Sequence, residues 1–127
     1  MRAVTLINAA DGVAVAGGAA LVAGATYYAE LNAAVAEKAT TQSMHWIWDA
    51  SIIATITIEM TNHPTVSVTA AAASGWDDAP PPTISILGGS AAQDNSPWIN
   101  VAPGRLRAKI VVGGTGGVLD GYFHGKV

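Results

Sequence analysis

The sequence predicts an all-β fold: a single β-sandwich or jelly-roll-like domain spanning residues 1–127. Many short segments are rich in β-branched residues, and turn signals built from Gly, Pro, Asn and Asp separate them. The alternating amphipathic helices of a βαβ fold are missing, and the sequence has no internal repeat. A chain of 127 residues is long enough for one such domain and too short for two.

Residues 1–42 are expected to hold the N-terminal strands and an attachment segment within the same domain. Residues 3–7 are an apolar run with β-branched side chains, and residues 13–16 and 20–23 are short apolar runs between glycine turns. Residues 25–38 are ambiguous, because Ala, Leu and Glu favour a helix whereas apolar and polar residues alternate at strand spacing. We prefer a strand through about Asn32, followed by a loop.

The middle of the chain contains the clearest strand. In residues 52–61, Ala and Ile alternate with Thr and Glu, so one face is expected to be buried and the other wetter. Residues 43–48 alternate in the same way and predict the strand before it. Residues 66–73 are a further candidate strand, whereas residues 74–82 end in three prolines, lack backbone donors there and are expected to be irregular.

The remaining segments are predicted from their composition. Residues 83–87 are a strand, residues 88–97 a polar loop and residues 98–101 a short apolar segment. Residues 105–112 are a strand whose basic side chains point outward. Its glycine-rich connection at residues 113–117 is expected to use positive φ angles, and the chain then returns as the second arm of a C-terminal hairpin.

Charge and composition exclude several classes of protein. Six basic against nine acidic residues give a net charge of −3, without the dense Lys/Arg face that a nucleic-acid-binding protein needs. Sparse charge suits contact with other subunits, and a core rich in Ala buries little area per residue, so stability is expected to come partly from partners. The uncharged residues 12–28 are mostly Gly and Ala and fall short of the ~20 residues of a membrane span, so we expect strand and turn.

No arrangement of residues predicts catalysis, a cofactor or a metal site. The glycines of residues 113–117 lead into a strand and not into a helix, so they do not form a phosphate-binding loop. The histidines at positions 45, 63 and 124 lie on separate segments, and the absence of cysteine removes thiolate ligands. We therefore expect a protein that is not an enzyme.

The carboxylates are candidates for acid–base and calcium chemistry. Asp49 and Glu59 are the pair nearest the apolar strands, but Glu59 is expected to pair with Arg107 across neighbouring strands. Asp77 and Asp78 are adjacent, so their side chains diverge and do not form a calcium loop. They are expected to be solvated.

Four tryptophans are the richest feature of the composition. Trp46 and Trp48 share one side of a strand, where core packing is expected. Trp76 and Trp98 lie in loop contexts, where they are candidates for subunit contacts or for stacking on a sugar ring. We favour subunit contact.

Several segments occur in an order that resembles small virion-associated structural proteins of tailed bacteriophages, of the decoration or spike type. They are WDASIIATITIE at residues 48–59, Asn62-His63-Pro64, the Gly75-Trp76 loop, RLRAKIVVGGTGG at residues 105–117 and His124-Gly125-Lys126. The resemblance covers roughly residues 43–127. It implies a β-sandwich particle component without identified catalysis. Pro80-Pro81-Pro82 depart from the pattern, which puts the contact made by the Gly-Trp loop in doubt.

Together these observations predict a capsid decoration protein of the head surface, assembled in the host cytoplasm and located on the virion. It would bind a major capsid or tail protein and form a homo-oligomer, with a trimer as the expected symmetry, without cofactor, metal, nucleic acid or membrane. A tail-associated structural protein and a glycan-binding β-sandwich displayed on the virion are the alternatives. The candidate contact residues are Trp76, Pro80, Pro81, Pro82, Trp98 and His124.

Overall fold

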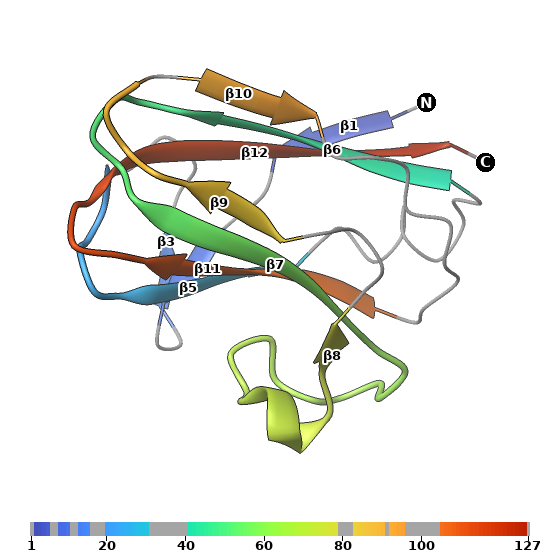
Figure 1. Cartoon of the computed structure of the whole chain (residues 1–127). Helices are drawn as coiled ribbons and strands as arrows, with labels where there is room; N and C mark the ends of the chain where they lie inside the picture. The colour runs from blue at the N-terminus through green and yellow to red at the C-terminus, as the bar shows by residue number, and fades with distance from the viewer. Residues whose placement is uncertain are drawn as a thin grey trace.

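The computed structural model describes residues 2–5, 8–10, 13–15, 20–30, 41–78, 83–90, 92–95 and 105–126. Within these ranges the chain is nearly all β and forms two antiparallel sheets, seen as the upper and lower layers of Figure 1. The predicted all-β class is therefore confirmed.

The first sheet has the strand order β1-β12-β6-β10, and β4 pairs with one end of β12. β12 and β6 are long and pair along eight residues, from Leu119 opposite Trp48 to Lys126 opposite Thr41. The bounds are β1 Arg2–Thr5, β4 Ala20–Leu21, β6 Thr41–Trp48, β10 Ala92–Asn95 and β12 Gly117–Lys126.

The second sheet has the strand order β3-β2-β5-β11-β7-β8, and β9 pairs with the other end of β7. β11 is its central strand, with β5 along one edge and β7 along the other. The bounds are β2 Asn8–Ala10, β3 Val13–Val15, β5 Thr26–Glu30, β7 Ala54–Thr61, β8 Asp77–Asp78, β9 Ile84–Ile86 and β11 Arg105–Val112.

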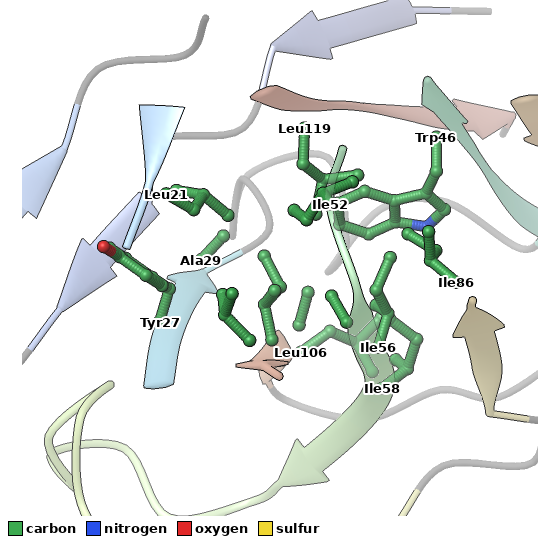
Figure 2. Packing of buried hydrophobic residues seen from close by; sticks show 14 residues of the cluster. Leu21, Tyr27, Ala29, Trp46, Ile52, Ile56, Ile58, Ile86, Leu106 and Leu119 are labelled. Carbon is green, nitrogen blue, oxygen red and sulfur yellow. The ribbon is translucent and has the colours of Figure 1, made fainter. Parts of the chain in front are cut away.

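One hydrophobic core lies between the sheets, because alternate side chains of the facing strands point inward. The first sheet contributes Trp46 and Leu119, which point toward Ile56 and Leu106 of the second sheet, and Ile52 fills the space between them (Figure 2). The predicted core role of Trp46 is confirmed, and Trp48 packs against the same cluster while remaining partly exposed.

Four of the connections that carry the chain from one sheet to the other lie together at the left of Figure 1. They join β4 to β5, β6 to β7, β9 to β10 and β11 to β12. We call this end of the molecule, formed by residues 22–25, 50–53, 87–90 and 113–116, the crossover end.

The predicted C-terminal hairpin is wrong, although the β11 boundaries are confirmed. Both edges of β11 are already occupied by β5 and β7, so no edge is free to accept β12. The chain instead crosses over at residues 113–116, and β12 pairs with β6, β1 and β4. Two consecutive strands with clear β patterns and a glycine-rich link are compatible with a hairpin or with a crossover between sheets. The strands that pair with each of them decide which arrangement forms.

The prediction that the glycines of residues 113–117 use positive φ angles is also wrong. In the crossover from β11 to β12, glycine is required because neighbouring atoms approach the backbone closely. A Cβ at position 116 would clash with the Leu21 carbonyl oxygen, and one at position 117 would clash with the Ser51 hydroxyl and lie 2.5 Å from Asp49 Oδ1. Neither residue has a φ angle in the left-handed region. The sheets can therefore be linked this tightly only where the link has no side chain.

Three other segments differ from expectation. Residues 66–73 form no strand and run irregularly into a short 3-10 turn, Ala72–Ser74. Residues 92–95, predicted as loop, form β10, because pairing with the long strand β6 overrides the low β propensity of Ala, Gln, Asp and Asn. Asp77–Asp78, predicted to be irregular, form the short strand β8, because neither residue is a proline and both pair with β7.

The ambiguous residues are settled in part. Thr26–Glu30 form β5, as preferred, and residues 31–38 lie outside the described residues, as do residues 98–101.

Candidate functional site

The crossover end combines four uncharged turns with exposed apolar side chains. Its four turns contain no Asp, Glu, Lys or Arg; they consist of Gly, Ala, Ser, Thr, Val, Ile and Leu. Leu87 is 84% exposed and Val22 64%, the highest values among the described large hydrophobic residues, and Ile53 of the same end is also exposed. Exposed apolar side chains gathered without charges are typical of a surface that contacts another protein.

Backbone hydrogen bonds between the turns hold this end rigid. The Ile53 carbonyl accepts from Gly113 N–H at 2.7 Å, and the Ile53 N–H donates to the Thr115 carbonyl at 2.9 Å. Further bonds run from Gly24 N to Gly113 O and from Gly89 N to Ala50 O. Because each turn is tied to another, a partner would meet a surface that already has its final shape, which lowers the entropic cost of binding.

Asp49 is the group that joins two of the crossovers. Its Oδ2 accepts a hydrogen bond from the Val118 N–H at 2.9 Å, and its Oδ1 accepts from the N–H groups of Ser51 and Ile52. The Ser51 hydroxyl lies 2.9 Å from the same Oδ1 and 3.0 Å from the Gly116 carbonyl oxygen. The carboxylate therefore has a structural role, and both of its oxygens are occupied.

These donors lower the pKa of Asp49. The Val118 N–H has the largest effect, followed by the Ser51 hydroxyl, because each stabilises the ionised carboxylate. A group with a lowered pKa in the folded state contributes stability above its unfolded pKa, which is about 3.9 for Asp, and loses that contribution as the pH falls through the folded value.

We therefore expect Asp49→Asn to be less stable than the wild type at pH 7, with a difference that narrows as the pH falls below about 4. The asparagine amide cannot accept all of the bonds that the two carboxylate oxygens accept. Urea midpoints measured between pH 3 and pH 7 check this, with Asp77→Asn, at an exposed position of β8, as the control. A difference that stays constant over this pH range would contradict the role of the carboxylate charge.

A second ordered feature, a segment that covers a buried arginine, lies on the outer face of the second sheet. Residues 62–76, which we call the strap, fold back across the end of β7 and β11; Figure 1 shows them in yellow-green beneath the sheet. Arg107 points outward from β11, as predicted, yet none of it is exposed, because the strap covers it.

The Arg107 guanidinium is held on every side. Its Nε donates to Glu59 Oε1 at 2.8 Å, and Nη2 lies 2.7 Å from the same oxygen in ion-pair contact without hydrogen-bond alignment. Its Nη1 donates to the carbonyls of Val68 and Ala70 at 2.8 and 2.6 Å. The Tyr28 and Trp76 ring centroids lie 4.4 and 4.5 Å from its Cζ. The predicted Glu59–Arg107 pair is confirmed, and it is buried.

Trp76 anchors the strap, which corrects its prediction as a contact residue. It is 2% exposed, its Nε1 donates to the Ser67 carbonyl at 3.1 Å, and its ring also packs on Arg105. Arg105 in turn donates to the Val66 carbonyl at 2.6 Å. The indole is thus enclosed by its own chain, so it offers no platform to a sugar and no anchor to a neighbouring subunit.

Of the other candidate contact residues, the structure describes only the backbone of His124. Pro80, Pro81, Pro82 and Trp98 lie outside the described residues. The backbone of His124 lies in β12, opposite Ala3 and Ser43.

No catalytic or metal arrangement emerges from the side chains that the structure describes. No three His, Asp or Glu among them are placed to hold a metal ion. Asp49 and Glu59, the carboxylates weighed for acid–base chemistry, are engaged in separate structural bonds. Asp77 and Asp78 are exposed, as expected. Of the helical structure described, none is long and apolar enough to span a membrane.

Comparison with protein-family models, with curated proteins and with solved structures finds no match for this chain.

Proposed function

We propose that this protein is a structural component of a tailed-phage particle, acting through protein–protein contacts, with the surface of the head as its place. The observation that carries the proposal is the crossover end. Its four turns contain no charged residue, they expose Leu87 and Val22, and they are tied together by backbone hydrogen bonds. A protein partner suits such a surface, whereas nucleic acid needs cations there to neutralise its phosphates.

The strand order supports a jelly-roll β-sandwich as the finer fold. Taken in chain order, β4, β6, β10 and β12 belong to the first sheet and β5, β7, β9 and β11 to the second, so the chain changes layer at every step of this series except from β7 to β9. The resulting orders, β4-β12-β6-β10 and β5-β11-β7-β9, are those of two interleaved Greek keys. This fold serves both capsid and lectin domains, so it supports either class and does not by itself choose a function.

The resemblance of residues 43–127 to virion-associated proteins is the reason for naming a phage particle. On that resemblance we infer a location on a virion assembled in the host cytoplasm, a capsid or tail protein as partner, and a homo-oligomer, expected to be a trimer, as the unit that binds. A position on the tail is the alternative within the same class. The glycan-binding alternative has lost its basis at Trp76, because that ring is buried within the chain.

The test is whether the chain is carried by particles. Virus particles released from the source cells would be banded in a density gradient, and the head and tail fractions analysed by mass spectrometry. We expect the chain in the head fraction. Its presence with tails alone would move the proposal to the tail, and its absence from all particles would overturn the structural role.

Replacing Leu87 with aspartate tests the crossover end itself. We expect Leu87→Asp to remain folded, because the side chain is 84% exposed, and to be lost from the particle band, because a charge would be buried at the contact. Ala73→Asp, at an exposed position of the strap, is the matched control and should remain in the band. Equal recovery of the two variants would show that the contact lies elsewhere.

A further inference from the structure

We propose that copies of this chain associate face to back, with the outer face of the second sheet of one copy packed on the outer face of the first sheet of the next. The inference rests on the proposed assembly role and names the surfaces and the partner, a second copy of this chain. We call the first of these surfaces, centred on Lys109 and Val111, the lysine face. The other, centred on Ile47 and Asp120, is the aspartate face.

The lysine face is the part of the second sheet that the strap leaves open. Lys109 and Val111 point outward from β11, because Ala108, Ile110 and Val112 between and beside them point into the core. Val111 is 41% exposed. Its cross-strand neighbours are Thr26 and Thr55, and the β7 neighbour of Lys109 is Thr57. The three threonines leave Val111 accessible, and the β5 neighbour of Lys109 is Tyr28, whose ring lies over Arg107, so Lys109 remains partly exposed.

The aspartate face has the same construction with the opposite charge. Ile47 and Asp120 lie directly opposite each other on β6 and β12, and both point outward because Trp46 and Leu119 next to them point into the core. Ile47 is 40% exposed. Each face therefore presents one exposed β-branched hydrophobic residue beside one charged residue.

Charge complementarity selects the partner face. A two-fold contact between identical faces would gather two Lys109 or two Asp120 side chains at one interface, whereas a face-to-back contact brings opposite charges together. Among the described residues, neither charge has an ion-pair partner within its own chain. Both remain available for a second copy.

The spacing of the groups allows both contacts at once. Residues two apart on a strand lie about 7 Å apart, residues opposite each other on neighbouring strands about 5 Å, and stacked sheets about 10 Å. With Val111 packed on Ile47, the flexible Lys109 side chain can cover the remaining distance to Asp120. Because the contact joins two different surfaces, the assembly either closes into a ring or continues as a fibre.

The test uses charge reversal and light scattering at several concentrations. We expect the wild type to form an assembly larger than a monomer. Lys109→Glu and Asp120→Lys should each need about tenfold or more higher concentration to associate, because like charges then meet. Thr65→Glu, at an exposed position of the strap, is the control and should keep the wild-type mass.

Mixing the two charge-reversal variants distinguishes a lost contact from a folding defect, because misfolded variants would not regain association on mixing. Equal amounts of the Lys109→Glu and Asp120→Lys variants should associate with each other, because both of the contacts between them join opposite charges. The double variant should associate on its own for the same reason. Thermal melts of each variant confirm that the single variants are folded.

A wild-type monomer at every concentration would overturn the inference, as would single variants that keep the wild-type mass, or a mixture that does not associate. None of these outcomes bears on whether the chain is found in the particle band, which is measured separately. The proposed role in the particle can therefore be correct even if this contact between copies is not found. The contact can likewise be found even if the chain is absent from particles.

Discussion

Arg107→Leu should be the most destabilising of the substitutions considered, with a loss of about 3–5 kcal/mol of unfolding free energy. The substitution leaves the Glu59 carboxylate buried without its counter-charge and leaves the carbonyls of Val68 and Ala70 without their donor. Urea unfolding followed by tryptophan fluorescence measures the loss, because Trp76 packs on the same guanidinium.

Two comparisons make this result specific. Thr65→Leu, at an exposed position of the strap that covers Arg107, should cost no more than about 0.5 kcal/mol. The double variant Glu59→Leu with Arg107→Leu should recover part of the loss, because no unpaired charge is then buried. If the double variant lost the sum of both single effects, the buried ion pair would not be the cause.

Gly116→Ala should have the second largest effect, a loss of about 3 kcal/mol. The added methyl group would meet the Leu21 carbonyl oxygen and lie 3.1 Å from the Ala23 amide nitrogen, and backbone atoms cannot move aside as a flexible side chain can. The crossover between β11 and β12 would have to shift away from the β4–β5 turn. The thermal midpoint measured by calorimetry reports the cost.

The same crossover offers a matched control. A Cβ at position 114 would meet nothing within 4 Å, so Gly114→Ala should change stability by no more than about 0.5 kcal/mol. Similar losses in both variants would mean that flexibility of the link, and not close approach, is what the glycines provide.

Local pattern was sufficient for the strands that carry the core. β7 alternates apolar and polar residues over its whole length and β11 does so from Arg105 to Ile110, and both were predicted within two residues of their observed bounds. β10 was missed because its residues have no β preference of their own and are ordered by pairing with β6. Periodicity reports which face of a strand is buried, and it does not report which strand lies beside it.

The candidate sites were harder to predict for a related reason. The Glu59–Arg107 pair followed from cross-strand charge, but its burial depends on the strap, whose main-chain carbonyls are the acceptors. Every residue has a main-chain carbonyl, so the sequence does not show which carbonyls will accept hydrogen bonds from a side chain. The crossover end was likewise invisible, because it is assembled from four turns distant in the chain. A signal was nevertheless present, since each of those turns is free of charged residues.

The position of β11 and β12 has a consequence for how the chain folds during synthesis. Each is an inner strand of its sheet, with neighbours on both edges, and in this sequence both follow all the other strands. Until they leave the ribosome, β5 cannot be joined to β7, nor β1 to β6. The nascent domain therefore exposes its apolar strands until β11 and β12 have emerged, and it is expected to fold slowly and with a need for chaperone protection.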